Sequence, residues 1–251
     1  MSLSVLRRVA ATLLLCALVA AAGRPAAAEA LTPQQKSAVD QEIHDYLMNH
    51  PDVLLDALKA AQEKSDAETA AQASRMIVQD HKQLFDDPDD LVAGNPKGTA
   101  TIVEFFDYRC PYCKQLQPTL DALIDEDSKL RVVYKEFPIL GEASVFATRA
   151  ALAARQQGKY AAFHRAMMAT KGDVTDATVL KVAATLGLDL GKLKADMRSP
   201  DIDHIIEANY KLASALGIDG TPGLIVGNRL IPGVVDIGTL RKDIAAARKS
   251  S

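Results

Sequence analysis

Cysteine is scarce in this chain of 251 residues, and the scarcity limits what its thiols can do. There are three cysteines, Cys16, Cys110 and Cys113, and no second closely spaced pair. A zinc site needs four ligands, and the five histidines are scattered along the chain, so zinc is disfavoured. A structural disulfide is also disfavoured, because a bridge across two residues closes a very short loop and removes little chain entropy.

Long apolar runs are also rare, and the one of note is at the amino terminus. Two adjacent arginines precede the apolar residues 9–22, and small residues follow up to Ala28, which is the pattern of a Sec-type signal peptide. We expect residues 1–28 to be removed and the mature protein to be periplasmic. Cleavage also removes Cys16, which leaves a single pair of cysteines.

No charge of one sign dominates the chain. The formal net charge is −3, and removal of three arginines with the signal peptide changes it to −6. Charges of both signs are dispersed, which gives no indication of nucleic acid as a partner. No later segment approaches the roughly 18 apolar residues that a membrane-spanning helix requires, so we expect no membrane insertion after cleavage. No internal repeat of fixed period occurs.

Residues 29–85 are predicted to form an amino-terminal helical arm. Thr32 and Pro33 have the pattern of an N-cap followed by a first-turn proline, with a capping-box partner three residues after the cap. Pro51 ends this helix and begins a second one. The apolar stripe of the second helix is thin over residues 62–74. Two interpretations follow: an arm that lies across the catalytic domain, or an oligomerisation segment whose apolar ends meet copies of itself.

Residues 86–251 are predicted to form one α/β domain. A polar linker with Asp, Pro, Gly and Asn precedes a strand, a helix and a second strand, whose short crossover indicates parallel pairing. A helical insertion of about 75 residues follows, and then a hairpin and a last helix. The segments are 86–96 for the linker, 99–108, 112–124 and 130–137 for the strand-helix-strand unit, 142–216 for the insertion, 224–231 for the hairpin and 236–248 for the last helix.

The cysteine pair lies where the first strand ends and a helix begins. Unpaired N–H groups and the helix dipole at this position stabilise a thiolate, so the pKa of Cys110 is expected to be low. Cys113 lies one turn further along, close enough to form a disulfide with Cys110. We therefore predict that Cys110 is the nucleophile and Cys113 the resolving thiol of a dithiol-disulfide exchange. Two soft thiolates also suit Cu(I), so a non-enzymatic copper-binding protein is an alternative.

Glu104 lies on the same predicted strand, six residues before Cys110. A carboxylate on a buried strand is costly unless it is paired or functional. It is a candidate for moving a proton to or from Cys113, and the alternative is a salt bridge with Lys135 on the next strand. Thr221 and Pro222 precede the hairpin and, taken alone, indicate only a turn.

Together these residues resemble the DsbA-like branch of the thioredoxin superfamily. The similarity extends from residue 99 to about 248 and includes Val103-Glu104-Phe105-Phe106-Asp107-Tyr108-Arg109-Cys110-Pro111-Tyr112-Cys113, the helical insertion and Gly220-Thr221-Pro222.

The resemblance implies a thioredoxin fold with an inserted helical domain, and no cofactor beyond a redox-active Cys110–Cys113 disulfide. It implies a cis bond between Thr221 and Pro222 opposite Cys110, with the Thr221 backbone pairing to an extended substrate. It also implies that Glu104 is the buried acid of the family. The Pro111-Tyr112 dipeptide is then the pair that tunes the redox potential.

The arm, with Asp45-Tyr46-Leu47 and His50-Pro51-Asp52-Val53-Leu54, is similar to that of ScsC-type proteins, named for suppression of copper sensitivity. The resemblance implies a homo-oligomer, in some members a trimer that works as a disulfide isomerase. We therefore expect an isomerase of exported proteins with a membrane redox partner. A monomeric DsbA-like oxidase is the alternative.

Overall fold

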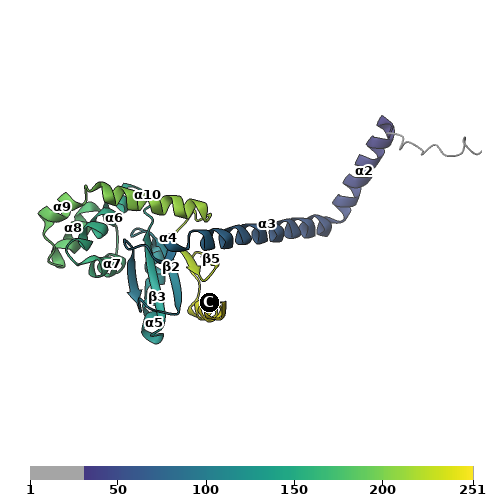
Figure 1. Cartoon of the computed structure of the whole chain (residues 1–251). Coiled ribbons are helices and arrows are strands. Elements are labelled where there is room, and N and C mark those ends of the chain that lie inside the picture. The colour runs from purple at the N-terminus through teal and green to yellow at the C-terminus, as the bar shows by residue number, and fades with distance from the viewer. Residues whose placement is uncertain (1–30, 251) are drawn as a thin grey trace, which may run out of the picture. The chain divides into compact units, whose positions relative to one another are not determined.

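A computed structural model of the protein describes residues 31–250, so the predicted signal peptide and Cys16 lie outside the described residues (Figure 1). The chain divides into two compact units, Met1–Gln62 and Glu63–Ser251. The second unit begins well before the linker predicted at residue 86. The reason lies in the packing of residues 73–85, which is described below.

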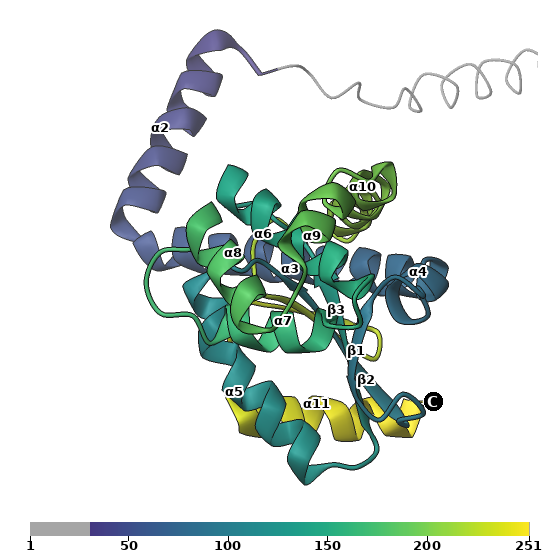
Figure 2. The same ribbon diagram turned by 90° about the vertical axis from the view of Figure 1, so that its left-hand side faces the viewer.

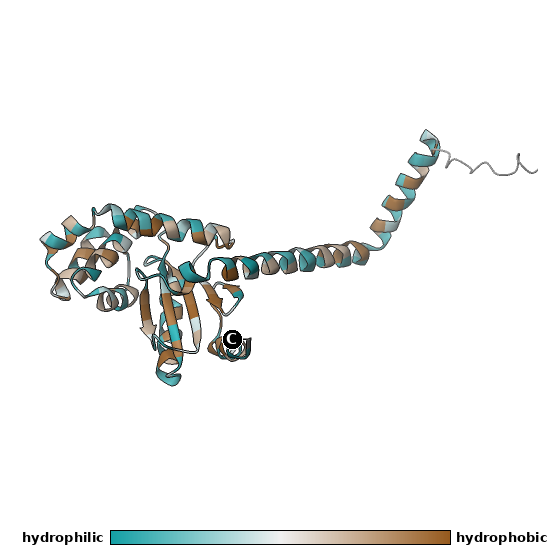
Figure 3. Ribbon diagram, viewed as in Figure 1, coloured by the Kyte–Doolittle hydropathy of each residue, from teal (hydrophilic) through white to brown (hydrophobic). Residues whose placement is uncertain are grey.

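The first unit contains α2, Pro33–Asn49, and the beginning of α3, Pro51–Gln79. The predicted capping box is present: the Gln35 backbone N–H donates to Thr32 Oγ1 at 3.3 Å, and the Thr32 N–H donates to Gln35 Oε1 at 2.9 Å. No residue of α2 is buried. Hydrophobic residues nevertheless recur along α2 and the first turns of α3 (Figure 3). The exposed ones are Val39, Ile43, Tyr46, Met48, Val53, Leu54, Leu55 and Leu58.

The second unit is built on a five-stranded sheet with the strand order β1-β3-β2-β4-β5. The central strand β2 pairs with β3 in parallel, as the strand-helix-strand prediction requires, and with β4 in antiparallel orientation. β4 and β5 form the predicted hairpin. The strands are β1 Leu91–Gly94, β2 Ala100–Phe106, β3 Leu130–Glu136, β4 Gly223–Val226 and β5 Arg229–Pro232.

Alternate residues of β2 enter two separate cores. Ile102 and Phe106 belong to the larger core, which also contains residues of α5, Pro111–Glu126, and α11, Ile237–Ser250. These two helices lie side by side (Figure 2). Val103 and Phe105 face the other way. They pack with the end of α3, with α4, His81–Phe85, and with α10, Pro200–Ala215. Both faces of β2 are therefore covered, as its apolar sequence predicts.

The helical insertion consists of five helices, of which α6 to α9 form one cluster (Figure 1). α6 contributes a run of buried alanines that lets neighbouring helices approach closely, and it contacts α7, α8 and α9. The insertion begins directly after β3, and this places its first helix close to the end of the central strand. Its helices are α6 Glu142–Arg155, α7 Tyr160–Met168, α8 Asp176–Thr185, α9 Leu190–Asp196 and α10.

The segment between the arm and the sheet was not foreseen as a structural part of the domain. Ala73, Ile77, Leu84 and Phe85 are buried, and the last three belong to the core on the second face of the sheet. The predicted linker also contains β1, which pairs antiparallel with β3. A four-residue edge strand beside a cluster of aspartates has too few residues for a periodic signal.

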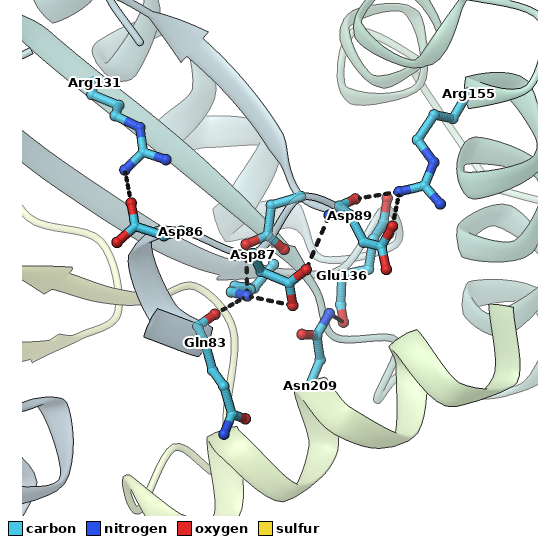
Figure 4. A network of polar contacts seen from close by, with 10 residues as sticks. Gln83, Asp86, Asp87, Asp89, Arg131, Glu136, Arg155 and Asn209 are labelled. Atoms are coloured by element: carbon cyan, nitrogen blue, oxygen red, sulfur yellow. Dashed lines mark hydrogen bonds and ion pairs between the residues drawn. The ribbon is translucent and has the colours of Figure 1, made fainter. Parts of the chain in front are cut away.

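Lys135 on β3 explains part of this attachment. Its side chain is fully buried, and its Nζ lies 2.6 Å from Asp90 Oδ2 and 3.7 Å from Asp87 Oδ2. It also donates to the backbone oxygen of Gln83 in α4; this polar network is drawn in Figure 4. The suggested salt bridge between Lys135 and Glu104 is therefore wrong: Lys135 is the register partner of Phe105, so it points to the opposite face of the sheet.

Candidate active site

Cys110 is the N-cap of α5, directly after the central strand. Its backbone is extended, with φ −69° and ψ 116°, and Pro111 occupies the first turn. The backbone N–H of Cys113 donates to Cys110 Sγ at 3.3 Å. Both cysteines are free thiols and both are buried, whereas Tyr112 between them is 61% exposed. The local sequence thus places one sulfur at a helix amino terminus and the other one turn inside it.

The electrostatic environment separates the two thiols. The pKa of Cys110 is lowered from 9.0 to about 6, mainly because the Cys113 thiol donates a hydrogen bond to it; backbone N–H groups of Cys113 and Tyr112 add to the effect. Burial, the hydrogen bond with Cys110 and the nearby charge of Glu104 raise the pKa of Cys113. Near neutral pH, Cys110 is therefore a thiolate and Cys113 a thiol. Only the thiolate is a strong nucleophile.

Glu104 lies beneath this pair on β2 and is fully buried. Neither of its carboxyl oxygens has a hydrogen-bond partner, and burial raises its pKa well above 4.5, with further contributions from Cys110 and Asp121. Its register partners are Tyr134 on β3 and Leu224 on β4, which provide no cation. A carboxyl group whose pKa is raised by burial can exchange a proton with a neighbouring thiol.

Thr221 and Pro222 lie next to the thiols although they are far away in the sequence. Their peptide bond is cis, and Cys110 Sγ lies 3.2 Å from the Thr221 carbonyl oxygen. The carbonyl oxygen of Pro222 accepts a hydrogen bond from the N–H of Gly233 at 2.8 Å. A cavity of about 180 Å³ borders this loop, lined in part by Ile218 and Leu230. The structure therefore brings Thr221 and Pro222 beside Cys110, although Thr221 lies 111 positions after it in the sequence.

Two residues that precede the cysteines were not singled out as site residues. The buried Asp107 accepts hydrogen bonds from the backbone N–H of Arg109 at 2.7 Å, the N–H of Leu140 at 2.9 Å and the hydroxyl of Ser144 at 2.8 Å. It thus joins the Cys110 loop to the start of the helical insertion. The Asp-x-x-Cys spacing was the available signal, since aspartate side chains often accept from the N–H two residues later.

Tyr108 is the second residue of this kind. Its hydroxyl lies 3.0 Å from Glu136 Oε1 and 3.3 Å from His164 Nδ1. All three side chains are buried. Glu136 and His164 lie 28 and 56 positions after Tyr108 in the sequence, and no local pattern relates the three residues.

Among residues 31–250, no group of three or more His, Cys, Asp or Glu side chains could hold a metal ion. The two thiols remain the one pair of soft ligands at this site. The Cu(I) alternative stays a prediction.

Comparison with known proteins agrees with this architecture. Residues 101–245 match the family described as DSBA-like thioredoxin domain, and residues 35–68 match the Copper resistance protein ScsC N-terminal domain. A thioredoxin-like oxidoreductase from Silicibacter pomeroyi is 47% identical; the match covers 68% of this chain and 98% of that one, with a TM-score of 0.66.

Two further solved structures extend the comparison. The thiol-disulfide exchange protein alpha-DsbA2 from Wolbachia pipientis is 30% identical over 70% of this chain and 96% of that one, with a TM-score of 0.66. Proteus mirabilis ScsC in a transitional conformation is 26% identical over 88% of this chain and 100% of that one, with a TM-score of 0.65. The similarity to this structure thus extends beyond the catalytic unit.

Curated relatives include the Na(+)/H(+) antiporter NhaA 3 of Salinispora tropica, 29% identical over 168 residues. The match covers 66% of this chain, and the chain spans about a quarter of that relative's length, 26%. Within the described residues, every helix is too short or too polar to cross a membrane.

Proposed function

The chain belongs to the DsbA-like thioredoxin family of thiol-disulfide oxidoreductases, and on that premise we propose that it is a periplasmic disulfide isomerase of exported proteins. One observation is central to this proposal: a thiolate-favouring Cys110 at the start of α5, beside the backbone of Thr221. The solved structure of a periplasmic thioredoxin-like protein from Salmonella enterica, 32% identical, supports the location.

The reaction begins with attack of the Cys110 thiolate on one sulfur of a substrate disulfide. The substrate S–S bond breaks, its other sulfur leaves as a thiolate, and a mixed disulfide with Cys110 forms. The released thiolate can then attack a different disulfide of the same substrate, which releases a second substrate thiolate. This second thiolate attacks the substrate sulfur of the mixed disulfide, and Cys110 leaves as a thiolate. No electrons are transferred overall, and the substrate is isomerised.

Cys113 provides the exit from a stalled mixed disulfide. It loses its proton and attacks Cys110 Sγ, the substrate leaves with both sulfurs reduced, and the pair becomes a disulfide after giving up two electrons. Glu104 exchanges the proton with Cys113, taking it as carboxylate when Cys113 attacks and returning it when Cys113 leaves. Its burial next to Cys113, without a hydrogen-bond partner or a cation, supports this role.

Substrate docking is assigned to Thr221 and Pro222. An extended peptide can pair with the Thr221 backbone as an added strand, which places its cysteine near Cys110 Sγ. Pro111 and the exposed Tyr112 complete this surface and set the redox potential of the pair. The membrane redox partner would meet the same surface, because it must reach the same sulfur.

Oligomerisation is assigned to the arm. Eight large apolar side chains of α2 and early α3 are at least 37% exposed, and exposed apolar surface of this kind marks interaction sites. Copies of the same segment would cover it, in a trimer or another closed form. Two or more reactive sites in one assembly suit an isomerase, which must attack several disulfides of one substrate.

Refolding of scrambled ribonuclease tests the isomerase assignment. Catalytic amounts of the reduced protein should restore ribonuclease activity, and a variant that lacks residues 31–62 should scatter light as a monomer and lose this activity while it keeps dithiol reactivity. A full-length protein that is monomeric and oxidises reduced substrates without reshuffling scrambled ones would establish the oxidase alternative. Stoichiometric Cu(I) binding without any mixed disulfide would establish the copper-binding alternative.

A further inference from the structure

A chain of buried polar side chains leads from α5 to the end of β3 and passes the active-site loop. It runs from Gln117 through His164 and Tyr108 to Glu136, and each member is at most 7% exposed. Gln117 Oε1 lies 3.2 Å from His164 Nε2, and Tyr108 lies within hydrogen-bond distance of both His164 and Glu136. The dithiol reaction does not use Glu136 or His164.

Two residues outside this row of side chains fix the orientation of Gln117. Its Nε2 group donates to Asp121 Oδ1 at 2.9 Å and to the Tyr134 hydroxyl at 3.1 Å. The exposed Asp121 carboxylate can only accept, so the amide nitrogen must face it and the amide oxygen must face His164. An amide oxygen also only accepts. The proton between the two residues is therefore on His164 Nε2.

The position of that proton determines the next two hydrogen bonds. Burial lowers the pKa of His164 to about 3, so the imidazole is neutral and has a single N–H. With the proton on Nε2, His164 Nδ1 is bare and accepts from the Tyr108 hydroxyl. Tyr108 has one proton, which is then used toward His164. It cannot also donate to Glu136 Oε1, which lies 3.0 Å away.

A proton is still required between those two oxygens, and Glu136 is the one group that can supply it. The remaining contacts agree: the Tyr160 hydroxyl lies 3.0 Å from the same Oε1, and the Thr148 hydroxyl donates to Oε2 at 2.7 Å. A protonated Glu136 therefore donates to Tyr108 and accepts from Tyr160 and Thr148. Every polar atom of the carboxyl group is satisfied.

From this donor-acceptor sequence we infer that Glu136 is a protonated positioning residue, which holds the Cys110 loop through Tyr108 and ties it to the helical insertion. Thr148 belongs to α6 and Tyr160 to α7, so one carboxyl group connects three parts of the domain. This inference goes beyond the proposed function, because it holds for any direction of the thiol-disulfide exchange.

The charges around Glu136 support a bound proton. Burial raises its pKa to about 8, the hydroxyls of Thr148, Tyr160 and Tyr108 lower it in part, and the nearby charge of Asp107 raises it further. Lys135 precedes it in the chain but points to the other face, toward Asp90. Within residues 31–250, Glu136 forms no ion pair. Asn209 binds only its backbone oxygen, at 3.0 Å.

Loss of the Glu136 proton would reverse the donor and acceptor roles along this row of side chains. An ionised Glu136 needs the Tyr108 proton, so His164 must take the Nδ1–H form to donate to Tyr108. Its bare Nε2 would then face Gln117 Oε1, and that hydrogen bond would be lost. Ionisation of Glu136 should therefore be visible at His164 and should loosen the Cys110 loop.

Nitrogen NMR of protein with labelled histidine tests the inference without any functional assay. We expect His164, assigned with His164→Gln, to be the Nε2–H tautomer at neutral pH and to change with a midpoint near pH 8. Glu136→Gln, whose amide can donate to Tyr108 as the acid does, should keep the Nε2–H tautomer across the pH range in which the wild-type protein changes. An Nδ1–H tautomer at neutral pH in the wild-type protein would overturn the inference, and this readout needs no Glu136 variant.

The rate of Cys110 alkylation against pH tests the positioning role. The wild-type profile should show a second inflection near pH 8, above the thiolate titration, and Glu136→Gln should lose it. Tyr108→Phe, which removes the connecting hydroxyl, should lose it as well, whereas Tyr160→Phe should keep it. Identical second inflections in Glu136→Gln and wild type would overturn the positioning role. Because alkylation reports nucleophilicity alone, failure of the proposed isomerase function would leave this result unchanged.

Discussion

Replacement of Cys113 by alanine should raise the pKa of Cys110 by about one to two units. The Cys113 thiol is the largest cause of the low pKa of Cys110, because it donates a hydrogen bond to the thiolate. A hydrogen bond to a charged group contributes about 1.5 to 3 kcal/mol. One pKa unit corresponds to about 1.4 kcal/mol. We therefore expect Cys110 to titrate at about 7 to 8 in Cys113→Ala.

Cys113→Ser is the matched control, because its hydroxyl keeps a donor at nearly the same position. We expect its Cys110 to stay near the wild-type pKa of about 6. The thiolate absorbs in the ultraviolet, so absorbance against pH gives the three midpoints directly, and the alkylation rate against pH should give the same order. Equal midpoints for the alanine and serine variants would refute this account, since the backbone N–H groups alone would then hold the thiolate.

Three further changes test the packing and the buried charges. Ile77→Ala should lower the free energy of unfolding of the second unit, measured in urea, by about 2 to 5 kcal/mol because it opens a cavity in the core. Leu58→Ala in the first unit should change this free energy by less than about 0.5 kcal/mol. Equal effects of the two substitutions would contradict the unit boundary at Glu63. Lys135→Met should cost about 3 to 5 kcal/mol in the same assay because it leaves Asp90 without its buried partner, and a change below about 1 kcal/mol would contradict this. Burial raises the pKa of Glu104 in the folded protein, so the unfolded chain loses this proton first and the free energy of unfolding should fall as pH rises above 4.5. Glu104→Gln should show a smaller fall. Equal pH dependence of stability in the variant and the wild-type protein would contradict the raised pKa of Glu104.

The sequence predicts most of the second unit because its signals are local. The apolar strand at residues 100–106, the helix after Cys110 and the hairpin after Gly223 are each encoded in a short stretch of residues. The capping box at Thr32 is equally local, and the structure reproduces it in detail. Cys110 and Cys113 could be singled out from spacing alone, because three positions apart on a helix means one turn.

Long-range partners could not be predicted in this way. A salt bridge between Lys135 and Glu104 was the alternative to a functional Glu104, because both lie on neighbouring strands, yet the register puts them on opposite faces of the sheet. Ile77 looked like part of the arm, although it closes the core beneath Phe105. Glu136 is the last residue of β3, and no local pattern connects it to its partners. Its three hydroxyl partners lie in the loop before α5, in α6 and in α7, and only the folded structure brings them together.

The central claim is that Cys110 attacks a substrate disulfide and Cys113 resolves the product. Mass spectrometry of Cys113→Ser incubated with a disulfide-containing peptide tests it most directly. We expect a stable adduct of one peptide chain on Cys110, no such adduct on Cys110→Ser, and no accumulated adduct on the wild-type protein, which resolves it. An adduct that is absent from Cys113→Ser, or that forms on Cys113 in Cys110→Ser at a similar rate, would contradict the claim.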